Sequence, residues 1–410
     1  MIAEENVSAA NFHSGGVAMF RNLNIGGKLV LLGLVFSLPI AVLLFLLLKE
    51  QNIAIDFGQN ERRGVEYINP VRHLLHDIQK HQVAFLNGGA EASALEKQIE
   101  EDIRSAQEVD GRYGKELKTN HGLAGLVEKW STTKSLILRS SSNAKPENIN
   151  SAYDDIVGKS ILPLIIQAGD TSQLILDPDL DSYYAMDNVV INLPVLGQLI
   201  AQTNAHVADL ILTRENMESK KQLIAFLLAR IEPTMERVST GLQTSINQNP
   251  ALRNKLSLPL RTHIEAVKAF DDMIRRQVLD AGPSDFAKID LKSMSTNGLK
   301  TLESNYAMYD VTIGVLDDLL ATRVSGFNQR RIYSLVIAGI TIAIALLFIA
   351  SIGRSISKPL AELKEVTDRI VKGDLSTPAD IDRRDEIGQL AGAINRLQKT
   401  LQGSNKMKAA

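Results

Sequence analysis

Residues 29–48, "LVLLGLVFSLPIAVLLFLLL", decide the fold class, because this apolar run carries no charged side chain. About 20 such residues in a helix cross a hydrocarbon core of roughly 30 Å. A second uncharged run, "IYSLVIAGITIAIALLFIASIG", occupies residues 332–353 and is bracketed by arginines. The sequence therefore predicts two transmembrane helices. The first is expected to be an uncleaved anchor, because "LLLKEQNIA" lacks the small residues of a signal-peptide cleavage site.

The composition excludes several classes of protein. The chain has 410 residues, a formal net charge of −2, 45% hydrophobic residues and no cysteine. A balanced charge does not favour a nucleic-acid partner. The absence of cysteine excludes disulfides, thiolate metal ligands and a cysteine nucleophile. We therefore expect a folded protein that binds neither nucleic acid nor a cofactor.

The two spans divide the chain into a head, residues 1–28, a middle segment, residues 49–331, and a tail that begins at residue 354. Because the chain crosses the membrane twice, the head and the tail share one side and the middle segment lies on the other. In the middle segment, apolar residues recur every three or four positions over long stretches. The sequence therefore predicts an all-α protein, in which two transmembrane helices flank a long helical-bundle domain.

Turn-forming stretches divide the middle segment into roughly seven helices. A single bundle of four helices, each about 40 residues long, uses only about 160 to 180 residues. The middle segment is longer than that, so we expect two stacked bundles. The expected breaks lie near residues 87–91, 110–114, 140–148, 176–179, 213–219, 247–251 and 280–285.

The tail contains two amphipathic segments. Apolar or small residues recur at alternating steps of three and four, as in the seam of a coiled coil. Gly373 can end the first helix, and Asp385 is a suitable N-cap for the second, so the connector between them is expected to be extended. The first seam comprises Ile356, Leu360, Leu363, Thr367 and Ile370, and the second comprises Ile387, Leu390, Ile394, Leu397 and Leu401.

The tail contains Pro359 early in its first helix, Glu365, "GDL" at 373–375 and "DEIG" at 385–388. With these residues it resembles the HAMP linker of bacterial transmembrane receptors over about 50 residues, which we assign to 354–405, with 406–410 as a short end. In that family two subunits form a parallel four-helix bundle that relays movements of the second span. The resemblance therefore implies a homodimer in a bacterial inner membrane, a cytoplasmic tail and a periplasmic middle segment. The resemblance rests on, and assigns signal relay to, Pro359, Leu363, Glu365, Gly373, Leu375, Glu386, Ile387 and Gly388.

The stretch "LDPDLDSYYAMD", residues 176–187, allows three interpretations. A calcium loop is disfavoured, because Ser182 occupies the position at which the sharp turn needs glycine. Acid–base catalysis is disfavoured, because no nucleophile or third catalytic group lies nearby. A helix start fits best, with Asp177 as the N-cap and Pro178 at the first helical position.

Four polar residues near apolar seams are candidate ligand-binding residues. Tyr183 and Asp187 lie one turn apart on the same side of the helix after the acidic stretch. Arg72 and His76 lie in "YINPVRHLLHDIQKHQ", and His76 lacks the spaced partners of a zinc site. A guanidinium meets a carboxylate at two oxygens, so we expect a small organic acid as the ligand and Arg72 as its anchor. A structural pairing of Arg72 with Asp187 or a nearby Glu is the alternative.

Three stretches of the middle segment resemble the sensory regions of methyl-accepting chemotaxis receptors and of some sensor histidine kinases: "GVEYINPVRHLLHDIQKHQ", "LDPDLDSYYAMD" and "LDDLLATRVSGFNQRR". The sequence after Leu401 is only "QGSNKMKAA", so we expect no output domain and no catalysis. The leading hypothesis is a chemotaxis-receptor-like sensor with a HAMP relay. The alternatives are the N-terminal part of a sensor histidine kinase and a membrane protein that only pairs with other receptors.

Overall fold

The computed structural model describes residues 23–87, 92–140 and 146–409. Most of the predicted head, residues 1–28, lies outside these residues, as do parts of the expected breaks at 87–91 and 140–148. Within the described residues every regular element is helical, which confirms the all-α prediction. The chain forms two compact units, one of residues 53–328 and one that combines residues 1–52 with 329–410.

The unit of residues 53–328, called the sensor domain below, contains two helical bundles. The first bundle is formed by the end of α2 (Ile25–Leu86), α3 (Ala92–Tyr113), α4 (Asn120–Ser140), and α5 (Pro146–Ile156) with α6 (Leu162–Thr171). The second is formed by α7 (Leu180–Asp187) with α8 (Leu193–Thr213), α9 (Met217–Gln248), α10 (Arg253–Ile274) and the start of α12 (Leu291–Val371). Short helices join these elements: η2 (Leu174–Leu176), η4 (Pro250–Leu252) and α11 (Pro283–Phe286).

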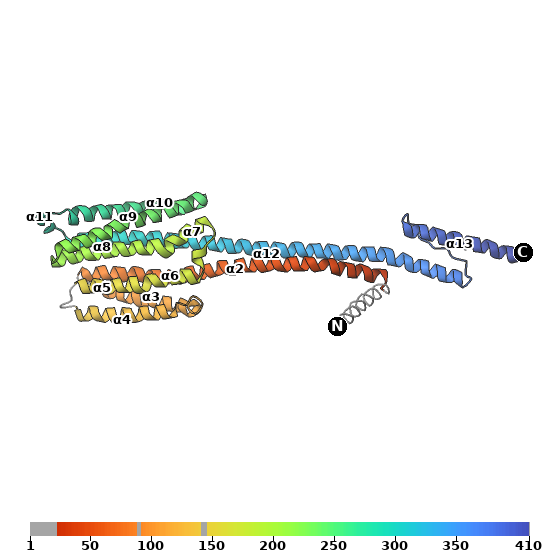
Figure 1. Cartoon of the computed structure of the whole chain (residues 1–410), viewed down its shortest axis with the longest axis horizontal. Coiled ribbons are helices and arrows are strands. Elements are labelled where there is room, and N and C mark those ends of the chain that lie inside the picture. Colours follow the sequence, from red (N-terminus) through yellow and green to blue (C-terminus); the bar gives the residue numbers. More distant parts are fainter. Residues whose placement is uncertain (1–22, 88–91, 141–145, 410) are drawn as a thin grey trace, which may run out of the picture. The chain divides into compact units, whose positions relative to one another are not determined.

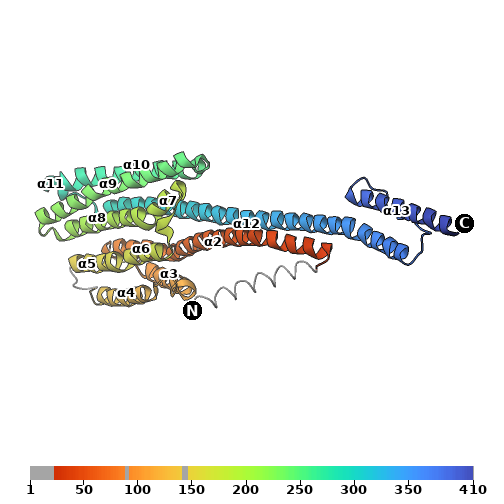
Figure 2. The same cartoon turned by 45° about the vertical axis from the view of Figure 1, so that its right-hand side comes forward.

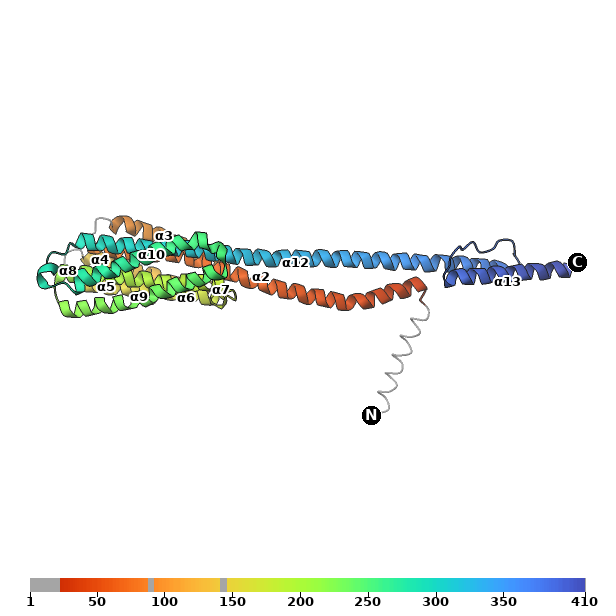
Figure 3. The ribbon, with the colours of Figure 1, turned by 90° about the horizontal axis from the view of Figure 1, so that it is seen from above.

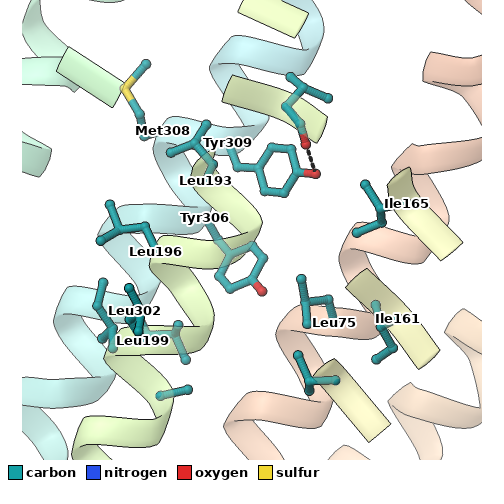
Figure 4. Close-up of a cluster of buried hydrophobic side chains, with 14 of the residues drawn as sticks. Leu75, Ile161, Ile165, Leu193, Leu196, Leu199, Leu302, Tyr306, Met308 and Tyr309 are labelled. Atoms are coloured by element: carbon teal, nitrogen blue, oxygen red, sulfur yellow. Dashed lines mark hydrogen bonds between the residues drawn. The ribbon is translucent and has the colours of Figure 1, made fainter. Parts of the chain in front are cut away.

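The two bundles lie side by side along their lengths, one above the other in Figures 1 and 2 and overlapping in Figure 3, which is seen from above, so the expected stacking is lateral. They share one hydrophobic core rather than enclosing two separate ones. Figure 4 shows side chains of α8 and α12, among them Leu196 and Tyr306, facing Leu75 of α2 and Ile161 and Ile165 of the neighbouring segment.

Three π-helical turns interrupt these helices: η1 (Val157–Ile161), η3 (Asn188–Asn192) and η5 (Arg275–Leu279). The first two end two residues before Pro163 and Pro194. A proline inside a helix lacks an N–H donor and its ring clashes with the carbonyl four residues earlier. A wider turn relieves that clash. The continuous α5–α6 and α7–α8 segments therefore tolerate their prolines.

Polar side chains bridge the two bundles inside this core. Gln79 of α2 is fully buried and donates to Gln198 of α8 at 2.9 Å. The Tyr306 hydroxyl of α12 donates to Gln79 Oε1 at 2.8 Å. Both the N–H₂ group and the oxygen of the buried Gln79 amide therefore have a partner, as a protein interior favours. The position of α2 against α8 and α12 is therefore specified by directional bonds as well as by apolar packing.

The other unit contains both candidate membrane spans and the tail. Each span lies in a long helix, α2 or α12, and its apolar side chains are not buried by protein. At one end of the spans Gln51 donates to the Ser334 hydroxyl at 3.3 Å, and Arg331 donates to Asn52 at 3.0 Å. The two spans are therefore antiparallel neighbours.

The tail forms a helix, a connector and a second helix, as the sequence predicts. After α12 ends at Val371, the connector leads to α13 (Glu386–Ala409), which runs beside the end of α12 (Figures 1 and 2). Gly373 has a φ of 88°, a conformation that favours glycine. Asp385 accepts a hydrogen bond from the Gly388 N–H at 3.1 Å, so it is the N-cap of α13.

The bridge between the bundles gives a first test. Tyr306→Phe removes the donor to Gln79 Oε1 and leaves that buried oxygen without this partner. We expect the free energy of unfolding to fall by about 1–3 kcal/mol. Thermal or denaturant unfolding of the purified chain in nanodiscs measures the loss. Tyr113→Phe is the control, because the Tyr113 hydroxyl bonds Glu66 at the surface; equal losses in the two variants would contradict a structural role for the bridge.

Candidate sensing and relay sites

Arg72 is a buried arginine of α2 that faces α12. Its side chain is 4% exposed and pairs with Asp310, whose side chain is 54% exposed. The Nη2 atom donates to Asn69 at 3.2 Å and lies 2.6 Å from His73 Nε2. The guanidinium also lies 5.6 Å from the ring centre of Tyr309, close enough for a cation–π contact. The Arg72 guanidinium is therefore positioned by several contacts, whereas the carboxylate of its partner Asp310 is exposed to solvent.

A groove of about 810 Å³, called the Arg72 groove, opens between α2, α12 and the end of α3. Charged side chains cross it in pairs. Arg62 of α2 forms a two-pronged ion pair with Asp317 of α12, at 2.8 and 3.2 Å. The groove therefore presents both cations and carboxylates, and its ion pairs join α2 to α12. Its lining includes Arg62, Arg63, Asn69, Arg72, Asp310 and Asp317.

His76, one turn after Arg72, also faces α12. Its Nε2 lies 3.3 Å from Glu303 Oε1, and its ring packs against Tyr306 with the ring centres 4.0 Å apart. The hydrogen bond from His76, together with Lys80, lowers the pKa of Glu303 to about 2, against an opposing effect of burial. Arg72 and His76 thus belong to one α2–α12 contact surface.

Tyr183 and Asp187 make local contacts on α7 instead. Tyr183 packs edge-to-face against Tyr184, with 5.3 Å between the ring centres. Asp187 accepts a hydrogen bond from Asn192 at 2.6 Å. The carboxylate that pairs with Arg72 is Asp310 and not Asp187. The contacts therefore bring Arg72 and His76 together and leave Tyr183 and Asp187 on another element.

The acidic stretch that precedes α7 takes part in a buried ion cluster, which we call the Arg323 cluster. Arg323 of α12 contacts Glu61 of α2 at 3.0 Å, Asp177 at 2.6 Å and Asp179 at 2.8 Å. The Ser182 hydroxyl donates to Asp177 at 2.9 Å. One arginine therefore ties the chain before α7 to both long helices of the sensor domain.

This cluster corrects the helix-start interpretation. The helix begins at Leu180, with Asp179 as the N-cap residue, and no side chain caps it. Asp177 and Pro178 precede the helix, and Asp177 uses its carboxylate for Arg323 and for the Asp179 N–H, at 3.0 Å. The expected N-cap at Asp177 is wrong because a buried guanidinium competes for that carboxylate and forms the stronger, charge-assisted bonds.

Glu61 is a functional candidate that the sequence did not reveal. It is fully buried, and burial raises its pKa to about 8; Arg323 opposes this effect, and Asp177 adds to it. Glu61 and Arg323 stand 262 positions apart in the sequence, so neither residue type nor local spacing indicates the pairing. The only signal in the sequence is that the charged Glu61 lies at helical spacing before Val65 and Ile68, which are buried residues of α2.

A second polar cluster explains why the polar side chain of Gln82 is buried on α2. Its side chain donates to Asn150 of α5 at 3.1 Å, inside the first bundle. The neighbouring His81 bonds the Tyr153 hydroxyl and packs edge-to-face against Trp130. Burial lowers the pKa of His81, so the neutral ring is favoured there. These polar residues are therefore structural contacts between α2, α4 and α5.

The candidate relay residues surround the small core of the tail. Leu363 is buried with Val366, Ala379 and Ala391, so one helix of the tail packs on the connector and on the other helix. The predicted seam position Thr367 is exposed, and the neighbouring Val366 is buried instead, in the same core as Ala379 of the connector. Pro359 and Glu365 lie on α12, Gly373 and Leu375 lie in the connector, and Glu386, Ile387 and Gly388 begin α13.

The second helix of the tail leaves apolar side chains uncovered. Leu390, Leu397 and Leu401 are 47%, 55% and 39% exposed in the single chain. All three belong to the predicted second seam, whose spacing is typical of a coiled coil. One chain therefore buries only part of that seam.

Comparison with known families identifies the tail. Residues 351–403 match the HAMP domain, close to the predicted bounds of 354–405. Curated relatives include the heme sensor protein HssS of Staphylococcus epidermidis, 35% identical over 82 residues, and that of Staphylococcus aureus, 29% identical over 82 residues. Each match covers 20% of this chain and 18% of the relative. No solved structure matches. The chain is a HAMP-containing transmembrane signalling protein.

The comparison corrects two expectations. The expectation that the protein is not an enzyme is contradicted, because the matched relatives are sensor histidine kinases, of which the match spans less than a fifth. The likeness to chemotaxis receptors is not supported, since these relatives are sensor kinases. The comparison therefore supports the alternative hypothesis, the N-terminal part of a sensor histidine kinase, better than the hypothesis of a chemotaxis-receptor-like sensor.

The Arg323 cluster predicts a pH dependence of stability. The pKa of Glu61 is raised in the folded protein to about 8 from its ordinary value of 4.5, so the folded state binds this proton more tightly. The contribution of Glu61 protonation to the free energy of unfolding is therefore fully present below about pH 4.5, and it is lost as the pH rises toward 8. Glu61→Gln mimics the neutral acid and removes this loss. The melting temperature of Glu61→Gln should therefore rise relative to that of the natural chain between pH 5 and 8.5. A difference that stays constant over this range would exclude a raised Glu61 pKa.

Proposed function

We propose that this chain is the sensory and relay part of a dimeric, membrane-bound sensor of the histidine-kinase class. In this proposal the sensor domain lies in the periplasm of a bacterium and the tail lies in the cytoplasm, with both spans in the inner membrane. The HAMP match at residues 351–403 and the likeness to sensor kinases support the class. The direction of insertion follows from the cytoplasmic location that HAMP domains have.

We propose the Arg72 groove as the ligand site, and a small organic acid as the ligand. The observation that carries the proposal is the unequal burial of one ion pair, with Arg72 at 4% and Asp310 at 54% exposure. Asp310 can turn into solvent at little cost, whereas a buried guanidinium needs an anion. A ligand carboxylate can therefore take the place of Asp310 on a cation that is already positioned. Arg62 and His76, on the same face of α2, are candidates for further contacts.

The groove also suggests how binding would reach the tail. Its paired charges belong to α2 and α12, and each of these helices contains a candidate span. A ligand that replaces Asp310 removes one bond between the two helices and inserts its own body between them. The preferred offset of α2 against α12 would then differ between the free and the bound state. A change of that kind is what a HAMP relay would pass on.

The heme ligand in the name of the matched relatives belongs to those proteins. The shared region covers 20% of this chain, which is too little to carry over a ligand site. Hemin is therefore a comparison probe, and the Arg72 groove predicts a preference for a small dicarboxylate such as succinate.

Ligand binding is tested by the melting temperature of the full chain in nanodiscs, with and without millimolar succinate. We expect succinate to raise the melting temperature by several degrees through mass action. Arg72→Ala should abolish this rise and keep the helical circular dichroism. Asp310→Asn should enlarge the rise, because it removes the competing carboxylate.

The control is Arg104→Ala on α3, whose side chain is 66% exposed and pairs only with Glu101 at 3.8 Å. This variant should keep the full response. If Arg72→Ala lowers the melting temperature without ligand and the response to succinate survives, Arg72 is a structural residue and the proposed site is wrong. A melting temperature that rises with hemin and not with succinate would show that the ligand is not a small organic acid.

The proposed dimer is tested at the exposed seam of α13. The chain has no cysteine, so Leu401→Cys gives a single reporter whose disulfide forms only between two copies. Leu397→Glu places charge in the seam without touching a buried contact of the single chain. We expect cross-linking to fall by about tenfold or more, because a buried unpaired charge costs several kcal/mol. Lys399→Glu, on an exposed face, is the control; cross-linking that survives Leu397→Glu would contradict a seam formed by two copies.

A further inference from the structure

Pro359 lies inside α12 and leaves one helical hydrogen bond unmade. In an α-helix each N–H donates to the carbonyl four residues earlier, and proline has no N–H. The carbonyl that lacks its helical donor is that of Ser355. The proline ring also presses on that carbonyl. The first turn of the tail therefore carries a backbone acceptor that is free to bond a donor from outside the helix.

Arg383 of the connector supplies this donor. Its Nη1 donates to the Ser355 carbonyl at 2.6 Å, and its Nη2 donates to the Ser355 hydroxyl at 3.2 Å. The same guanidinium bonds Asp385 through Nε at 3.0 Å. A planar guanidinium can serve both acceptors at once, which a lysine cannot do with comparable geometry. Arg383 therefore connects the Ser355 carbonyl, which lacks its helical hydrogen bond, to Asp385, which caps α13.

The start of α13 is built around this contact. The second carboxylate oxygen of Asp385 accepts the Gly388 N–H at 3.1 Å. This N–H and Arg383 together lower the pKa of the Asp385 carboxyl, so the cap stays ionised. A Cβ atom at Gly388 would lie 1.9 Å from the Arg383 carbonyl oxygen. Any side chain at position 388 must therefore displace the backbone of Arg383.

We propose that Arg383 is the positioning residue that couples the first turn of the tail to the start of α13. Movement of α12 moves the Ser355 carbonyl, and the guanidinium carries that movement to Asp385 and the cap of α13. Pro359 is needed because it keeps the Ser355 carbonyl free for Arg383. The contact lies wholly within the tail and does not depend on a ligand, so this role of Arg383 is separate from the proposed sensing function.

The coupling is tested by a double-mutant cycle, read by hydrogen exchange of residues 386–390 in the full chain in nanodiscs. Arg383→Ala should speed this exchange about tenfold or more, because the charge-assisted hydrogen bonds to the Ser355 carbonyl and to Asp385 are lost. Pro359→Ala restores an N–H that bonds the Ser355 carbonyl and takes it from Arg383. In the Pro359→Ala background, Arg383→Ala should therefore have an effect smaller by at least about threefold.

Three further variants sharpen the result. Arg384→Ala, at the exposed neighbouring arginine, should leave the exchange unchanged. Gly388→Ala should speed the exchange as Arg383→Ala does, and Arg383→Lys, which keeps one donor, should fall between the natural chain and Arg383→Ala. Equal effects of Arg383→Ala in both backgrounds would mean that Arg383 acts only through Asp385, and the coupling would be wrong. Unchanged exchange in Arg383→Ala would also overturn it.

Discussion

A buried guanidinium requires anionic partners. Through this requirement Arg323 fixes the relative positions of α2, α12 and the segment before α7 in the sensor domain. An arginine that is 12% exposed cannot leave its charge unpaired without a cost of several kcal/mol. Its three carboxylate partners come from α2 and from the segment before α7. The two long helices and the start of the second bundle are thus fixed at one point. Glu61 can share this site because burial favours its protonated form at neutral pH, which reduces repulsion among the carboxylates.

The contacts between α2 and α12 continue along the domain in a regular antiparallel order. From Glu61 with Arg323, they pass through Arg62 with Asp317 and Arg72 with Asp310 to His76 with Glu303. The bond between Gln79 and Tyr306 lies beside the last of these pairs, inside the core. A shift of α12 by one residue would break all of these pairs at once. Polar bonds therefore set the register that apolar packing alone would leave open.

Sequence reasoning succeeded where the determinants are local. Long apolar runs, turn-forming stretches, the glycine at 373 and the N-cap at Asp385 each act within a few residues, and the spans and most helix ends follow from them. It failed where a partner lies far away in the sequence. Asp177 was expected to cap a helix and instead pairs with Arg323, and the partner of Arg72 is Asp310. The register of α2 against α12 decides these pairs, and no local pattern encodes that register.

The ion pairs between α2 and α12 differ in how easily they can be exchanged. The Arg323 cluster is buried, and removing one partner would leave an uncompensated charge, so it resists change. The pair of Arg72 and Asp310 has one buried and one exposed member, so another carboxylate can replace Asp310 with the number of ion pairs unchanged. In the proposed function, a ligand that binds Arg72 shifts the population toward the exchanged state by its difference in affinity for the two states. With one fixed and one exchangeable contact between them, α2 and α12 can shift relative to each other while the sensor domain stays folded.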